Sequence, residues 1–164
     1  MVMNSSMQVI HDATPDSALS AALPPDLADI AEAGFTTQSG RLYLLPWREW
    51  PAPAHFGDWE AERWVNEIQL KSERDPADTR WRGDLLGQGL QLARRLLSRS
   101  AGFTSLPVQA CVSLQSAPDD IDPEADFAVG SVHIYLLREP GDDLTVRIDQ
   151  FTQPVLVLTT DDVP

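Results

Sequence analysis

Residues 81–115, WRGDLLGQGLQLARRLLSRSAGFTSLPVQACVSLQ, contain the change of hydrophobic period that decides the fold. In the first part of this stretch, apolar residues recur at every third or fourth position, which is the spacing of one helix face. The apolar stripe consists of Leu85, Leu86, Leu90, Ala93, Leu96 and Leu97. We therefore predict a helix over residues 81–99 that ends at Gly102.

After Gly102 the apolar and polar residues alternate, and a period of two predicts a strand over residues 106–115. Segments rich in β-branched and large apolar residues predict three more strands, at 128–138, 144–149 and 154–160. The turn-forming residues 139–143 predict a hairpin between the first two of these. Residues 129–137 are apolar at most positions of both faces, which predicts a central position in the sheet.

The first half of the chain has mainly helical patterns. Residues 26–33 and 57–72 are predicted as helices, and residues 41–47 as a short strand. Residues 1–22 are predicted to be a flexible arm, and residues 23–164 to form one domain. Helices followed by strands predict an α+β fold, with N-terminal helices packed on one face of a C-terminal, four- to five-stranded, mainly antiparallel sheet.

The charge balance is strongly acidic, with 25 acidic and 12 basic residues and a formal net charge of -13. The excess lies at the two ends, because residues 1–40 hold five acids and no base, and residues 101–164 hold eleven acids and two bases. Such a field repels nucleic acid and anionic membrane surfaces and attracts proteins with basic surfaces. We therefore expect a protein partner with a basic surface, and neither a nucleic acid nor a membrane.

The cellular location is predicted from two features of the sequence. Cys111 is the only cysteine, so no disulfide can form within the chain. Residues 1–10 lack the basic region and apolar run of a secretory signal. Both features favour the reducing cytoplasm.

Tryptophan is concentrated in one window, since all five tryptophans lie between residues 47 and 81. Large rigid rings bury much area at low entropic cost, and tryptophan is enriched at the energetic centres of protein interfaces. We predict that Trp47, Trp50 and Trp59 contact the partner. The alternative is that these rings fill the core.

Two acidic segments are the other predicted contacts with a basic partner. Asp119, Asp120 and Asp122 belong to a polar loop, and Asp142 and Asp143 to the predicted hairpin turn. The alternating carboxylates of the loop do not complete a calcium-binding loop, because neither the required glycine nor the bidentate glutamate is present. We expect no metal and no cofactor.

Catalytic signatures do not emerge from the sequence: we find no triad, metal cluster, phosphate-binding loop or cofactor fingerprint. Gly83, Gly87 and Gly89 lie inside the predicted helix, where close packing or a weakened helix explains them better than a phosphate loop.

The function predicted from these features is a non-enzymatic acidic binding protein, similar in kind to a toxin-neutralising immunity protein or other inhibitor, or to a secretion chaperone. One alternative is a small enzyme or ligand-binding domain with a pocket between sheet and helices, using His133, Cys111 and Arg147. A second alternative is a subunit of a larger assembly, such as a secretion apparatus.

Overall fold

The computed structural model describes residues 1–164 except 48, 51, 76, 119–125 and 164. The strands are β1 (Val2–Met3), β2 (Phe35–Gln38), β3 (Arg41–Leu44), β4 (Glu67–Leu70), β5 (Val108–Pro118), β6 (Asp126–Leu136) and β7 (Val155–Thr159). The α-helices are α1 (Ser5–Ala13), α2 (Asp16–Leu19), α3 (Pro25–Ala33), α4 (Asp58–Val65) and α5 (Trp81–Ser100). Four 3-10 helices complete the fold: η1 (Leu45–Trp47), η2 (Pro140–Asp142), η3 (Leu144–Gln150) and η4 (Thr160–Asp162).

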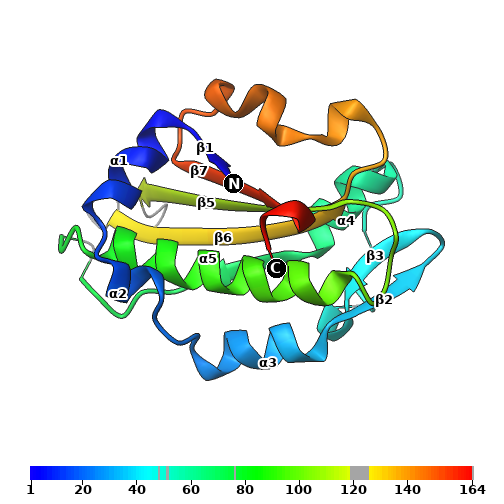
Figure 1. Cartoon of the computed structure of the whole chain (residues 1–164), viewed down its shortest axis with the longest axis horizontal. Helices are drawn as coiled ribbons and strands as arrows, with labels where there is room; N and C mark the ends of the chain where they lie inside the picture. The colour runs from blue at the N-terminus through cyan, green and yellow to red at the C-terminus, as the bar shows by residue number, and fades with distance from the viewer. Residues whose placement is uncertain (48, 51, 76, 119–125, 164) are drawn as a thin grey trace.

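A five-stranded sheet lies at the centre, in the order β1-β7-β5-β6-β4 with every neighbouring pair antiparallel (Figure 1). Strands β2 and β3 form a separate hairpin. The N-terminal helices and the mainly C-terminal antiparallel sheet confirm the predicted α+β class. Strand β6 lies between β5 and β4, as its two apolar faces predict.

Helix α5 crosses one face of the sheet, and its apolar stripe forms the centre of the main core (Figure 1). The alternation predicted for β5 is confirmed, since Val108, Ala110, Val112 and Leu114 all face this core and are buried. Helices α1, α2 and α3 also contact α5, and α1 contacts β7 as well. Within the described ranges, no helix combines the length and apolar character needed to cross a membrane.

Two glycines of α5 mark where its neighbours come closest. A Cβ atom on Gly89 would lie 2.5 Å from Cγ1 of Val112 in the sheet, and one on Gly87 would lie 2.2 Å from the carbonyl oxygen of Ala18 in α2. Real side chains do not approach so closely, so these positions need glycine for packing. Close packing is therefore the role of these glycines.

The predicted helix over residues 57–72 is wrong in its second half. Helix α4 ends at Val65, and residues 67–70 form β4, which pairs with β6. Ile68 and Leu70 alternate with the polar Glu67 and Gln69, and this strand pattern prevails because it places both apolar side chains in the main core. Trp64, near the end of α4, is 48% exposed.

The predicted strand over residues 144–149 is also wrong, because these residues form η3. Leu144 and Ile148 are buried together on one side, whereas Val146 is 73% exposed. Apolar residues at every second position fit a strand, but here only Leu144 and Ile148 lie on the buried side and Val146 does not. The segment at 139–143 is correspondingly a link through η2 into η3 and not a hairpin turn.

Residues 1–22, predicted as a flexible arm, form β1, α1 and α2. Met7 is fully buried in the main core, and the side chain of Asn4 is held by backbone groups near β7. The Asn4 side-chain oxygen also accepts from the backbone N–H of Met7, which caps α1. A segment with weak periodicity is thus placed by a strand pair and one buried methionine.

Candidate functional site

The sheet face opposite α5 carries a layer of polar and reactive side chains. Because register partners of antiparallel strands point to the same face, this layer is built from pairs. The pairs are Gln109 with Tyr135, Cys111 with His133, and Ser113 with Ser131. Helices α4 and η3 lie over this face, and a second, smaller apolar cluster fills the space beneath η3.

A chain of hydrogen bonds runs through this layer from His133. Its Nδ1 lies 3.0 Å from the carbonyl oxygen of Arg63, and its Nε2 lies 3.1 Å from the Ser131 hydroxyl. Since a carbonyl can only accept, Nδ1 carries the proton, and Nε2 accepts from Ser131. Ser113 then donates to Ser131 over 2.9 Å. Burial lowers the pKa of His133, so the imidazole is neutral at pH 7.

Cys111 and His133 are thus adjacent, as one of the functional alternatives requires. Burial raises the pKa of the Cys111 thiol to about 11, against an opposing effect of the Arg63 charge. A protonated thiol is a poor nucleophile. Five hollows among the described residues are lined by other side chains, and Cys111, His133 and Arg147 line none of these five.

The predicted contact residues Asp142 and Asp143 hold the fold of the segment after β6. Asp142 accepts hydrogen bonds from the backbone N–H groups of Arg138 and Glu139. Asp143 caps η3 by accepting from Thr145, and it accepts from the Gln109 amide over 2.8 Å. Burial raises the pKa of Asp143, but these hydrogen bonds outweigh it and the net pKa is lowered.

The loop residues Asp119, Asp120 and Asp122 lie outside the described residues. Their predicted role as contacts stays a prediction. Among the residues that are described, no group of three or more histidine, cysteine and carboxylate side chains is arranged to hold a metal ion.

The three tryptophans predicted as contacts occupy different environments. Trp47 is half-buried against the main core. Trp59 is half-buried over the second cluster, in an edge-to-face contact with Tyr135 at 5.7 Å between ring centroids. Trp50 is 61% exposed. Only Trp50 offers most of its ring to a partner.

Trp50 lines two hollows, one of which is formed with residues of the β2–β3 hairpin. One is lined by residues that include Arg41, Tyr43 and Ala52, and the other by Ala33, Leu45 and Pro46. Both hollows are also lined by Trp50 and Glu49. We call Glu49, Trp50 and these two hollows the Trp50 surface.

Trp59 is also flanked by two arginines, which contact its ring from different elements. The guanidinium carbon of Arg63, in α4, lies 5.3 Å from the ring centroid, and that of Arg147, in η3, lies 5.6 Å away. Glu67 follows α4 in β4, where its carboxylate accepts a hydrogen bond from the Gln69 side chain. We call these three residues the Arg63–Trp59–Arg147 cluster.

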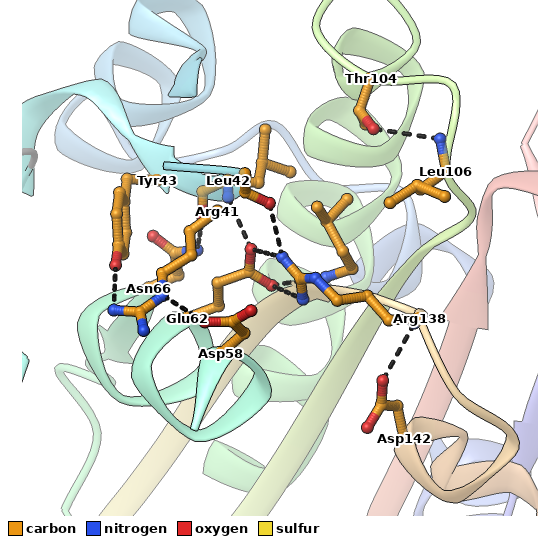
Figure 2. A network of polar contacts seen from close by, with 12 residues as sticks. Arg41, Leu42, Tyr43, Asp58, Glu62, Asn66, Thr104, Leu106, Arg138 and Asp142 are labelled. Carbon is orange, nitrogen blue, oxygen red and sulfur yellow. Dashed lines mark hydrogen bonds and ion pairs between the residues drawn. The ribbon is translucent and has the colours of Figure 1, made fainter. Parts of the chain in front are cut away.

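A buried polar network joins the hairpin to the sheet, and the sequence did not predict it (Figure 2). Glu62 of α4 accepts from the backbone N–H groups of Leu42 and Leu136, and it pairs with Arg138. Asn66, at the end of α4, accepts from Leu44 N–H and donates to the carbonyls of Leu42 and Ile134. The only signal in the sequence was a glutamate and an asparagine four positions apart.

Comparisons of this chain with protein-family models, with curated proteins and with solved structures find no match.

Proposed function

We propose that this protein is a non-enzymatic binding protein that docks a partner with a basic surface, and that Trp50 is the centre of the contact. The observation that carries this proposal is the 61% exposure of a tryptophan that lines two hollows. An exposed indole costs solvation free energy that burial in an interface recovers, and such rings dominate measured binding energies.

The charge of the chain supports a basic partner. With a net charge of -13, the protein attracts cationic surfaces over several ångströms and accelerates their encounter. At the Trp50 surface itself, the indole face can receive a lysine or arginine of the partner through a cation–π contact. Glu49 lines both hollows together with the ring.

The acidic loop supports the same proposal from the sequence. Asp119, Asp120 and Asp122 add three carboxylates within four positions. We propose that they steer the partner during encounter, while Trp50 provides most of the affinity of the final complex. We further propose a cytoplasmic location, since Cys111 is a buried free thiol and needs no oxidising compartment.

The test is capture of partners from a native lysate by the full chain, at low and at high salt, with two matched variants. Trp50→Ala removes the proposed anchor. Trp64→Ala is the control, because Trp64 is another exposed indole, on α4, and is 48% exposed. We expect a basic protein to be retained at low salt by the parent and by Trp64→Ala. The parent should not retain this protein at high salt, and Trp50→Ala should not retain it even at low salt.

Affinity and rate measurements on the captured protein separate the two roles. Trp50→Ala should weaken binding by about 30-fold or more, as expected for a residue at the centre of an interface. Neutralising the loop by Asp119→Asn, Asp120→Asn and Asp122→Asn should slow association and flatten its salt dependence. Retention of no basic protein, or equal retention by Trp50→Ala and the parent, overturns the proposal.

A further inference from the structure

The Arg63–Trp59–Arg147 cluster contains three buried hydrogen-bond donors without an acceptor. These are Nε of Arg63, Nε of Arg147 and Nε1 of Trp59. They are three of the five buried side-chain nitrogen and oxygen atoms that lack a partner in the described part of the chain. Buried polar groups in native proteins are nearly always paired, so a group of orphaned donors around one ring needs an explanation.

The two arginines also differ from four other arginines in this acidic protein, which pair with carboxylates. Arg41, Arg74, Arg80 and Arg138 each pair with a carboxylate. Neither Arg63 nor Arg147 forms an ion pair with any residue that the structure describes, although the chain holds 25 acidic residues. Two positive charges thus lie over one indole without an ion pair to any of the described residues.

The floor of the cluster is held in place. Trp59 packs edge-to-face on Tyr135, whose hydroxyl donates to Gln109 over 2.6 Å. Gln109 in turn accepts from the backbone N–H of Leu144, at the start of the helix that carries Arg147. The backbone carbonyl of Arg63 is fixed by His133. Donors on such a support lose little entropy when they bind a ligand.

We propose that the Arg63–Trp59–Arg147 cluster binds the oxyanion group, a phosphate or a carboxylate, of a small ligand. Planar guanidinium groups match these anions in geometry, and hydrogen bonds between opposite charges are about twice as strong as neutral ones. The ligand supplies the acceptors and the negative charge that the cluster lacks. This site is separate from the Trp50 surface, and the inference does not depend on the proposed function.

The test is a titration of the full chain in which proton–nitrogen NMR monitors the indole N–H and arginine Nε–H groups. The Trp59 signal is assigned by its loss in Trp59→Phe. Sodium phosphate and sodium acetate are the two probes, and sodium chloride at matched ionic strength is the control. We expect a saturable shift of the Trp59 indole N–H with at least one oxyanion, no such shift with chloride, and no comparable shift at the other four indoles.

Variants decide whether the two arginines bind the anion. Arg147→Gln should weaken binding of the effective oxyanion by about 10-fold or more, because a charged hydrogen-bond donor is removed. Arg63→Lys keeps the charge, loses the planar fork, and should also weaken binding. Arg94→Gln is the control, because it removes one charge from an exposed arginine of α5.

The titrations also distinguish the two sources of the anion. Saturation by phosphate alone points to a phosphorylated ligand, and saturation by acetate to a carboxylate. A shift that fails to saturate with either probe, or that matches the chloride control, overturns the inference. Equal affinities of Arg147→Gln, Arg63→Lys and Arg94→Gln overturn it as well, since the effect is then general charge and not a site.

Discussion

Glu62 and Arg138 lie 76 positions apart in the sequence and form a partly buried ion pair, with 2.5 Å between Glu62 Oε1 and Arg138 Nη2. The Glu62 side chain is 0% exposed. Its two oxygens also accept backbone N–H groups of Leu42 and Leu136, so one carboxylate joins α4, β3 and β6 (Figure 2). Together with the hydrogen bonds of Asn66, the contacts of Glu62 attach the β2–β3 hairpin to α4 and the sheet. This hairpin flanks the Trp50 surface.

Replacing Glu62 by glutamine should destabilise the protein by about 3 kcal/mol, because it leaves a partly buried guanidinium unpaired and turns an amide N–H toward other donors. The free energy of unfolding in urea measures this change. Asp58→Asn is the matched control: Asp58 pairs with Arg41 on the surface, and its loss should cost about 0.5 kcal/mol. Equal losses from the two variants would show that Glu62 is no more than a surface charge.

Replacing Gly87 by alanine should destabilise the protein, although alanine favours helices by about 1 kcal/mol over glycine. The new Cβ would lie 2.2 Å from the backbone oxygen of Ala18, so α2 must move away from α5. The neighbouring contact from the Gln91 amide to the carbonyl of Leu19 would then be strained or lost. We expect a net loss of about 1–3 kcal/mol in urea unfolding, which is the range for overpacking.

Gly102→Ala controls for the general effect of the substitution. A Cβ on Gly102 would meet only the Arg99 carbonyl oxygen, at the ordinary contact distance of 3.6 Å. This variant should be neutral or slightly more stable than the parent. Stabilisation by Gly87→Ala would show that α2 does not hold its place against α5.

The parts of the fold that the sequence predicted are those with long, consistent periods. The stripe of α5 extends over five turns, and the alternation of β5 over more than three cycles, so tertiary contacts only reinforced them. The predictions for short segments were wrong because the same few apolar residues fit both the helical period and the strand period. Residues 67–70 continue a helical stripe as well as an alternating one, and pairing with β6 decided between them.

The candidate sites were predictable only in residue type. Tryptophan content indicated an interface, but exposure distinguishes Trp50 from Trp47 and Trp59, and exposure is a property of the packed chain. The aspartates at 142 and 143 have the composition of a contact surface, yet backbone N–H groups use their oxygens. The pairing of Arg63 with Arg147 across one ring depends on the position of η3, whose structure the sequence did not predict.

Cys111 should resist thiol reagents in the folded protein. It is buried, and its pKa of about 11 leaves little thiolate at pH 8. We expect slow modification by an aromatic disulfide reagent under native conditions and fast, complete modification in guanidinium chloride. Because the chain has one cysteine, the absorbance change reports this site alone. Fast modification of the folded protein would mean that η3 opens readily from the sheet.

The stability of the protein should fall as the pH is lowered below the ordinary histidine pKa of 6.5, because of His133. Burial lowers the pKa of His133 in the folded state, so between that pKa and 6.5 the unfolded chain binds a proton that the folded chain does not. Stability contributed by the neutral imidazole is therefore fully present above 6.5 and is lost as the pH falls toward the folded pKa. One proton limits the slope to about 1.4 kcal/mol per pH unit.

The groups around His133 allow this slope to be separated from other titrations. Arg63 opposes protonation through its charge, while its backbone carbonyl and Glu67 favour it, and burial outweighs them. The lowered carboxylate pKa values of Asp143 and Asp162 act below 3.8, outside this window. Urea unfolding between pH 8 and pH 5 should therefore show a slope that His133→Gln reduces and that His55→Gln, at an exposed histidine, leaves in place. The contradicting outcome is an equal slope in the parent and in His133→Gln. The imidazole could then be protonated without breaking its hydrogen bonds to Arg63 and Ser131. This face of the sheet would therefore be accessible to water.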